Sequence, residues 1–373
     1  MNEIFKILTL CIEQIIIQVK KPENMSLKLK TTCVLVSLIC FLLILLQPVH
    51  AQYNFSDLDA KVDFAKKQWG EDLSVLIYRD GKIIYSKSTG TFTAKTQAPI
   101  ASCSKWLTAA LVMKLAEEGK IKLDDPISKY LPVFSKYSKG YITIKQCLSH
   151  LTGIESEPLK LGKLLQRTKY NSLEEEVMDF ASKREIMASP GTQFRYSNVG
   201  LNIAGKIIEI VSKRGFEQVM QEKLLRPLQM RNTSFSSFFA VNPSGGAVST
   251  PNDYINFLSM LLNKGMFNGK QILSEESVRL MHTVQTTQPM IKYAPKVAAG
   301  FNYGLGEWIQ ETDENGEATV VSCPGLFGTW PFIDRCRGYA SIIFLSGILS
   351  EEKRDLYMDI KKTIDQQIIA NCQ

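Results

Sequence analysis

Residues 102–118 read SCSKWLTAALVMKLAEE, and Gly119 follows them. Alanine and leucine are frequent in this stretch, Ser102 is a suitable N-cap and glycine is a typical stop, so it predicts one long helix. Apolar side chains fall on more than one face of that helix, which indicates a central, buried position. The segments on either side must therefore supply the layers that cover it.

Strand signals lie near both ends of the chain, and helical signals lie between them. Asp80-Gly81 separates two apolar runs, which is a strong hairpin signal, and strands joined by tight turns pair antiparallel. We therefore expect an α/β (α+β) fold: one antiparallel sheet built from both chain ends, flanked by helices, with an inserted helical region at about residues 120–285. The expected strands are Ser74–Tyr78, Lys82–Tyr85, Asn302–Thr312, Ala318–Cys323, Thr329–Ile333 and Tyr339–Leu345, and further expected helices are Gly200–Lys213, Asp253–Leu262 and Glu351–Ile369.

The amino terminus has the pattern of a targeting segment. Residues 33–46 read CVLVSLICFLLILL, with Lys28 and Lys30 before them and Ala51 soon after. A basic region, a short apolar run and a small residue are typical of a secretory signal peptide, and the run is shorter than the roughly 20 residues of a membrane-spanning helix. We expect residues 1–51 to be a leader, with Met25 as an alternative start, and residues 52–373 to form one exported domain, periplasmic or secreted. An uncleaved membrane anchor is the alternative.

Composition excludes several functional classes. The 373 residues carry 44 Lys+Arg against 37 Asp+Glu, a net charge of +7, with no Lys/Arg run longer than two, so we expect no nucleic-acid partner. After residue 51 the chain has few histidines and no CxxC, so we expect no metal and no cofactor. The cysteines are too few for a disulfide scaffold, and the sequence does not pair them. These residues are His150, His282, Cys103, Cys147, Cys323, Cys336 and Cys372.

The central helix begins with a hydroxyl and an amine one turn apart. Ser102 and Lys105 form an S-x-x-K pair, and residues i and i+3 lie on one helical face. Serine is a weak nucleophile near neutral pH and needs such a neighbour. The positive end of the helix favours an alkoxide and lowers the pKa of the lysine. Taken alone, the pair is also explained by an N-cap serine beside a solvated lysine.

Two later segments add polar groups. Tyr196-Ser197-Asn198 follows a Pro-Gly turn, so it can present a phenol that shuttles a proton, if cationic neighbours lower its pKa, and an amide that orients a carbonyl or holds the lysine. Near the carboxyl terminus a strand ends at Gly325, where a glycine lets a substrate approach the backbone and the next amide, on Leu326, can bind an oxyanion. A buried tyrosine with a turn asparagine, and a plain strand end, are the alternatives.

In this order and spacing, the pieces resemble the serine β-lactamase and penicillin-binding-protein superfamily, in the branch of class C β-lactamases, DD-carboxypeptidases and family VIII-type esterases. The resemblance covers roughly residues 58–347. Besides the residues above, it rests on ITIKQCLSHLTGI at 142–154, PGTQFRYSN at 190–198, RPLQMRNTSF at 226–235 and GGAVSTPNDYINF at 245–257.

The resemblance implies a role for each matching residue. Ser102 would form an acyl-enzyme, and Lys105 and Tyr196 would together transfer the proton, first from Ser102 and then to the leaving group. Asn198 would position the substrate or the lysine, and the amides of Ser102 and Leu326 would bind the oxyanion. The resemblance gives His150 a structural position rather than a place in a triad.

The third motif departs from the family pattern. Relatives carry K-T-G or H-x-G, whereas this chain has Cys323-Pro324-Gly325, so the glycine is kept and the cation is lost. In lactamases and peptidases that cation helps to bind the substrate carboxylate; here another residue, such as Arg195 or Lys292, could supply the charge. The resemblance also places Cys323 opposite Cys103, where the two are either bridged or remain free buried thiols.

The sequence therefore predicts an exported serine hydrolase that acts through an acyl-enzyme on ester or peptide-like acyl substrates. A β-lactamase or D-alanyl-D-alanine carboxypeptidase is one alternative, and a catalytically inactive binding protein is another. The expected partner is a small-molecule or peptide substrate, with membrane contact only through an uncleaved leader, and the oligomeric state is not predicted.

Overall fold

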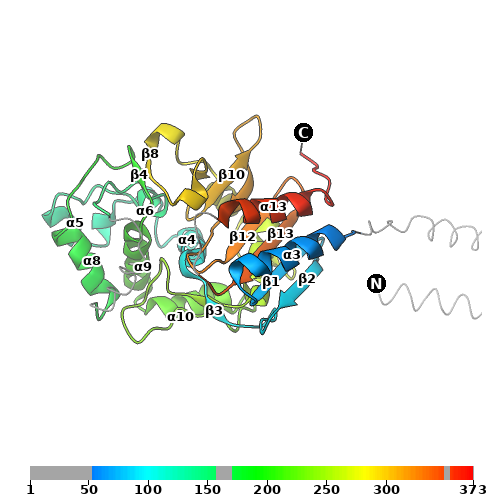
Figure 1. Cartoon of the computed structure of the whole chain (residues 1–373). Coiled ribbons are helices and arrows are strands. Elements are labelled where there is room, and N and C mark those ends of the chain that lie inside the picture. Colours follow the sequence, from blue (N-terminus) through cyan, green and yellow to red (C-terminus); the bar gives the residue numbers. More distant parts are fainter. Residues whose placement is uncertain (1–52, 157–169, 348–352, 373) are drawn as a thin grey trace, which may run out of the picture. The chain divides into compact units, whose positions relative to one another are not determined.

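The computed structural model describes residues 53–156, 170–347 and 353–372 (Figure 1). The predicted leader lies outside these residues. No helix within them is long and apolar enough to cross a bilayer. The helices are α3 Ser56–Trp69, α4 Ser104–Glu117, α5 Val133–Lys136, α6 Ile144–Leu148, α8 Leu173–Ser182, α9 Val199–Ser212, α10 Phe216–Met220, α11 Pro251–Leu262, α12 Glu275–Met281 and α13 Arg354–Asp365. The strands are β1 Leu73–Arg79, β2 Lys82–Thr89, β3 Ala98–Pro99, β4 Phe194–Arg195, β5 Val248–Ser249, β6 Met266–Phe267, β7 Lys270–Gln271, β8 Ile291–Tyr293, β9 Asn302–Tyr303, β10 Trp308–Thr312, β11 Ala318–Ser322, β12 Trp330–Asp334 and β13 Tyr339–Leu345.

The main sheet is built from both ends of the chain, as predicted. Its seven strands lie in the order β2-β1-β13-β12-β11-β10-β9, and every neighbouring pair is antiparallel. The amino-terminal hairpin turns at Asp80 and Gly81, whose φ values of 49° and 81° are those of a type I′ turn. The expected fold class is therefore confirmed.

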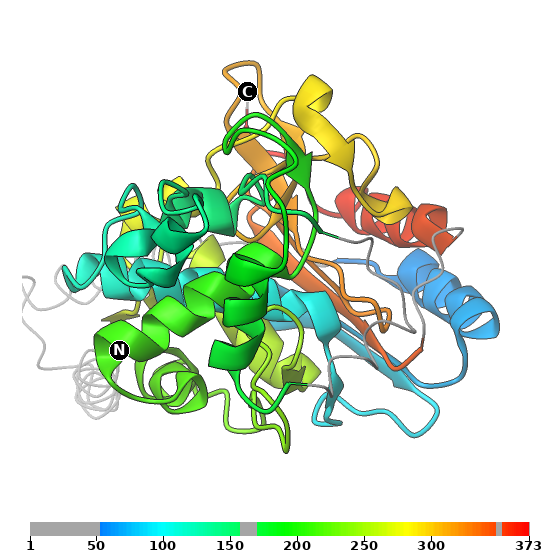
Figure 2. The same ribbon diagram turned by 90° about the vertical axis from the view of Figure 1, so that its left-hand side faces the viewer.

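Helices cover both faces of this sheet. Strand β13 is buried at every position, which requires apolar partners on either side. Figure 2 shows the two terminal helices α3 and α13 beside one face and the helical region beyond the other, and α11 of that region packs against β1 and β13. The helical region thus contacts the sheet face at β1 and β13, and β9 forms the sheet edge beyond β11 and β10.

The helix α4 occupies the centre, as its composition predicts. Eleven of its residues are buried, from Ser104 to Met113 and at Leu115, so apolar side chains on all its faces find partners. The regular helix begins at Ser104, and a 3-10 turn, Ala101–Cys103, precedes it. Ser102 is therefore inside that turn and is not the side-chain N-cap that the sequence suggested.

The expected single strand Asn302–Thr312 is wrong, because it folds into two strands. β9 and β10 pair with each other, with Tyr303 opposite Trp308. The reversal uses Gly306, whose φ of 82° favours glycine, and the amide of Gly304 donates to the carbonyl of Glu307 at 2.9 Å. Apolar alternation alone does not show this turn, since the two glycines interrupt a run that otherwise has strand composition.

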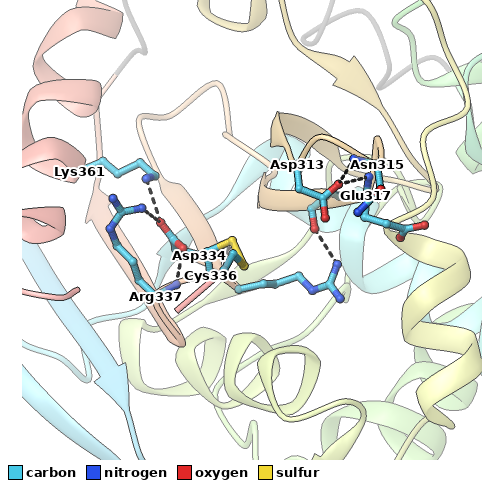
Figure 3. The surroundings of a disulfide bond; sticks show 10 residues. Asp313, Asn315, Glu317, Asp334, Cys336, Arg337 and Lys361 are labelled. Carbon is cyan, nitrogen blue, oxygen red and sulfur yellow. Dashed lines mark hydrogen bonds and ion pairs between the residues drawn. A yellow bond between two sulfur atoms is a disulfide. The ribbon is translucent and has the colours of Figure 1, made fainter. Parts of the chain in front are cut away.

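Among the described residues one disulfide, Cys336–Cys372, joins the turn after β12 to the segment beyond α13 (Figure 3). Beside it Asp334, which is fully buried, accepts hydrogen bonds from the Arg337 guanidinium and the Lys361 ammonium, each at 3.1 Å. Paired charges and the covalent bond thus fix α13 to the sheet.

Replacing both disulfide cysteines, Cys336→Ser with Cys372→Ser, should lower the free energy of unfolding by about 3–4 kcal/mol, because the bond closes a loop of 36 residues. Denaturant titration of the wild type and the double variant measures this loss. Dithiothreitol should destabilise the wild type and leave the variant unchanged. Equal midpoints for the two proteins in the absence of reductant would contradict the prediction.

Candidate active site

A tight turn presents Ser102 at the start of α4. Ala101, the preceding residue, has φ of 44°, a left-handed conformation that costs a non-glycine residue about 1–2 kcal/mol. The hydroxyl of Ser104 holds the turn: it donates to the Ala101 carbonyl at 2.6 Å and accepts from the amide of Ala247 at 3.0 Å. As a result, Ser102 is fixed while 9% of its surface stays exposed.

Lys105 is fully buried and contacts Ser102. Its Nζ lies 3.3 Å from Ser102 Oγ, 3.0 Å from Asn198 Oδ1 and 2.7 Å from the carbonyl oxygen of Ser244. Burial lowers the pKa of Lys105 to about 7, so a substantial fraction of this amine is neutral near neutral pH. The dominant cause is loss of solvent rather than the helix terminus that the sequence pointed to.

The structure brings Tyr196 and Asn198 to the same place from the start of α9. The Lys105 Nζ lies 5.0 Å from the centre of the Tyr196 ring, and Asn198 accepts from Lys105. Burial raises the pKa of Tyr196 well above its ordinary value, although its hydrogen bond with Ser102 acts in the opposite direction. The condition that cationic neighbours lower this pKa is therefore not met, and Tyr196 is a neutral phenol that can donate a proton.

An aromatic cluster that the sequence did not reveal surrounds Tyr196. Its members are His150, Phe194, Tyr303 and Trp308, and Trp308 lies 5.1 Å from Tyr196 between ring centres. His150 Nδ1 lies 3.4 Å from the Ser197 amide, which donates to it, and Nε2 lies 3.0 Å from the Tyr303 hydroxyl. Burial, together with the charge of Lys105, holds the pKa of His150 well below its ordinary value. Both ring nitrogens of this neutral imidazole therefore hold neighbouring groups in place.

The third-motif residues lie directly behind the nucleophile. The Cys323 thiol is fully buried and donates to the carbonyls of Ser102, at 3.2 Å, and Gly306, at 3.5 Å. The Cys103 thiol instead faces the carbonyl of Thr329 at 3.6 Å. Because each sulfur faces a different carbonyl, the two thiols are free and the bridge between them is not formed. Burial raises the pKa of Cys323 to about 12, so this position carries no charge near neutral pH.

The structure gives a steric reason for glycine at position 325. A Cβ there would lie 2.3 Å from the Ile100 carbonyl oxygen and 3.1 Å from Cys103 Sγ. The glycine thus makes room for the turn before Ser102, and its contact with a substrate stays a prediction. Leu326 follows it and is half-buried, and its role as an oxyanion donor stays a prediction. Arg195 and Lys292 belong to the paired strands β4 and β8 beside Tyr196.

Sequence reasoning also missed Ser244, the closest hydrogen-bond acceptor of Lys105. Its role depends on a backbone carbonyl, which any residue type supplies, so no side-chain pattern marks it. The only signal was its place beside the glycines at 245–246, which begin one of the segments that carry the family resemblance. The site therefore combines α4, the start of α9, the end of β11 and the segment 243–247.

Comparisons with known proteins agree with this arrangement. A family model described as Beta-lactamase matches residues 60–361. Protein flp of Staphylococcus aureus (strain MW2) is 33% identical over 173 residues, which cover 43% of this chain and 34% of that protein. The match thus spans about a third of the length of this curated relative.

Two solved structures show the same fold. A putative beta-lactamase from Bacteroides dorei DSM 17855 has a TM-score of 0.75 and 28% identity, over 84% of this chain and 99% of that one. EstCE1, a hydrolase with promiscuous acyltransferase activity, has a TM-score of 0.67 and 21% identity, over 82% of this chain and 98% of that one.

Proposed function

Because the chain belongs to the beta-lactamase family, we propose that it is an exported serine hydrolase that acts on ester or peptide-like acyl substrates through an acyl-enzyme at Ser102. Family membership and the geometry together support a serine hydrolase. One observation carries the proposal: Lys105 Nζ lies 3.3 Å from Ser102 Oγ, and burial brings the pKa of Lys105 to about 7. A neutral amine at that distance is a suitable general base for a serine hydroxyl.

The residues in the site support a two-step reaction. Lys105 accepts the proton of Ser102 while Oγ bonds to the substrate carbonyl carbon and the carbonyl electron pair moves to oxygen. When that carbon–oxygen double bond re-forms, the leaving group departs and takes the proton from Tyr196, which Lys105 replenishes. A water then attacks the acyl-enzyme with the same residues as base and acid, which releases the acid and restores Ser102.

The third motif supports substrates that need no carboxylate partner. Cys323 is neutral and has no exposed surface, so this position offers no cation to a substrate. EstCE1, with its acyltransferase activity, has the same fold. A β-lactamase or D-alanyl-D-alanine carboxypeptidase remains the second candidate, supported by the family match and by the likeness to the Bacteroides dorei protein.

Export is supported by two features of the chain. Residues 28–51 have the pattern of a signal peptide. The Cys336–Cys372 bond is of the kind that persists in oxidising compartments. Both features support the proposed periplasmic or secreted location, and the proposed partner is a small molecule or peptide.

The test uses residues 52–373 incubated separately with fluorescent penicillin, a fluorophosphonate and p-nitrophenyl acetate, with intact mass as the readout. We expect a fluorophosphonate adduct on Ser102 and turnover of the ester. A lasting penicillin adduct, or penicillin turnover faster than ester turnover, would favour the second candidate. No adduct and no turnover with any of the three would reject a hydrolase and favour a binding protein.

Cys323→His tests whether the missing cation limits recognition. We expect kcat/KM for an ester that carries a carboxylate to rise at least about tenfold relative to its neutral analogue, because the imidazole is too large for the enclosed place of the thiol and, extending into the site as a cation, adds a charged hydrogen bond of about 1.5–3 kcal/mol. The larger ring should also cost about 1–3 kcal/mol of stability because the site is packed. Cys323→Ser, which adds neither charge nor bulk, is the control. If the ratio of kcat/KM for the two esters is unchanged in a folded Cys323→His variant, the missing cation does not limit recognition.

A further inference from the structure

The shortest polar contact of Lys105 is to a backbone segment that side chains of two helices hydrogen-bond. Its Nζ lies 2.7 Å from the Ser244 carbonyl, closer than to Ser102 or Asn198. From the same helix α4, one turn later, Thr108 Oγ1 donates to the carbonyl of Pro243 at 2.6 Å. Two successive carbonyls are thus held by two side chains of α4.

Helix α9 holds the same segment from the other side through Asn202. Asn202 Oδ1 accepts from the amide of Ser244 at 3.0 Å. The peptide group between Pro243 and Ser244 is therefore fixed at both of its polar atoms, at the carbonyl by Thr108 and at the N–H by Asn202. Gly205, one turn along α9, allows close approach, because a Cβ there would lie 2.3 Å from Pro243 Cγ.

A buried carboxylate fixes the orientation of the Asn202 amide. Asn202 Nδ2 donates to Glu176 Oε2 at 3.0 Å, and Asn202 and Glu176 are 0% and 4% exposed. Glu176 belongs to α8, so the chain of contacts crosses three helices. A flipped amide would point its oxygen at the carboxylate and its NH2 at the Ser244 N–H, so only one orientation satisfies both neighbours.

We propose that Asn202 and Glu176 are positioning residues for Lys105: they fix the Pro243–Ser244 peptide, which places the following carbonyl, that of Ser244, so that it holds the amine beside Ser102. The inference rests on the proposed function, and neither residue is required to touch the substrate. Asn198, which accepts from Lys105, precedes Asn202 by four residues, so one face of α9 sets both acceptors. Displacement of the Ser244 carbonyl would let the amine leave Ser102 Oγ.

A reciprocal exchange of the carboxylate and amide groups at positions 176 and 202 tests the proposed positioning role. Asn202→Asp places a carboxylate against Glu176 and should reduce kcat for p-nitrophenyl acetate about 10- to 100-fold, with KM within about twofold. Glu176→Gln keeps an acceptor for the Asn202 amide and is the matched control, with a loss of about fivefold at most. In the double variant the new amide at position 176 donates to the new carboxylate at position 202, which still accepts from Ser244. Its kcat should therefore recover to within about fivefold of the wild type.

Recovery in the double variant shows that the two residues act through each other, and a coupling to Lys105 in the second readout below is what a merely structural role would not produce. A double variant no better than Asn202→Asp, or a fully active Asn202→Asp, overturns the proposal. A second readout needs no turnover: the fall in Tm caused by Asn202→Asp should be several degrees smaller in a Lys105→Met background. If the Tm changes caused by Asn202→Asp and Lys105→Met are simply additive, that result alone overturns the proposal. If the fluorophosphonate does not label the wild type, the proposed function is rejected. The comparison of Tm changes with and without Lys105 then still decides whether Asn202 and Glu176 position Lys105.

Discussion

Ser102→Ala is expected to reduce ester turnover on the order of 10⁶-fold, the scale of loss when a serine hydrolase loses its nucleophile. The variant removes only the Oγ atom that Lys105 contacts. The turn before it keeps its side-chain hydrogen bonds, because the Ser104 hydroxyl makes them, to Ala101 and Ala247. Stopped assays with p-nitrophenyl acetate, together with intact-mass detection of the fluorophosphonate adduct, measure the effect.

The control for this experiment is Ser56→Ala, at the exposed start of α3, which should keep full activity and labelling. Thermal unfolding should show that Ser102→Ala keeps the wild-type fold. Labelling that persists on the Ser102→Ala protein would assign the reaction to another residue.

Lys105→Met is expected to lower the acylation rate about 10²- to 10⁴-fold, the usual contribution of a general base. Methionine has nearly the length of lysine, so the buried space stays filled while the amine is lost. In the wild type the rate should rise with pH through an apparent pKa of about 7, because only the neutral amine accepts the proton. The variant should lack that rise. Pre-steady-state measurement of fluorophosphonate labelling between pH 5 and pH 9 tests both statements.

The same substitution has a stability signature whose sign is fixed. The pKa of Lys105 is about 7 in the folded chain and about 10.4 when unfolded, so between these values only the unfolded state holds the proton. Stability of the wild type should therefore rise with pH across this window, by up to about 1.4 kcal/mol per pH unit, relative to Lys105→Met. Equal pH dependence of the two proteins in urea titrations would show that Lys105 is not desolvated in solution.

The fold could be predicted because its signals are local. Asp80-Gly81 marked a hairpin, and the composition of residues 102–118 marked a buried helix. The prediction failed at residues 302–312, where a close turn between glycines looks like a strand in the sequence. The last helix also ends earlier than expected, at Asp365 and not at Ile369, because apolar spacing continues beyond its hydrogen-bonded turns.

The site was predictable where chemistry depends on side-chain type. Ser102, Lys105, Tyr196 and Asn198 meet as their spacing and the resemblance suggested. What could not be predicted is carried by backbone atoms or by distant contacts. The Ser244 carbonyl has no side-chain signature, and the pKa of Tyr196 depends on burial, which no short motif encodes.

The sheet built from both chain ends has a consequence for how the protein acquires its structure. Leu73 pairs with Leu345, and Arg79 pairs with Tyr339, so the central strand pair joins residues about 270 positions apart. Such distant pairing makes folding slow and leaves strand edges open until the last part of the chain arrives. A chain still emerging from the ribosome cannot complete this sheet, so the domain is not yet folded when the proposed signal peptide first meets a translocation channel.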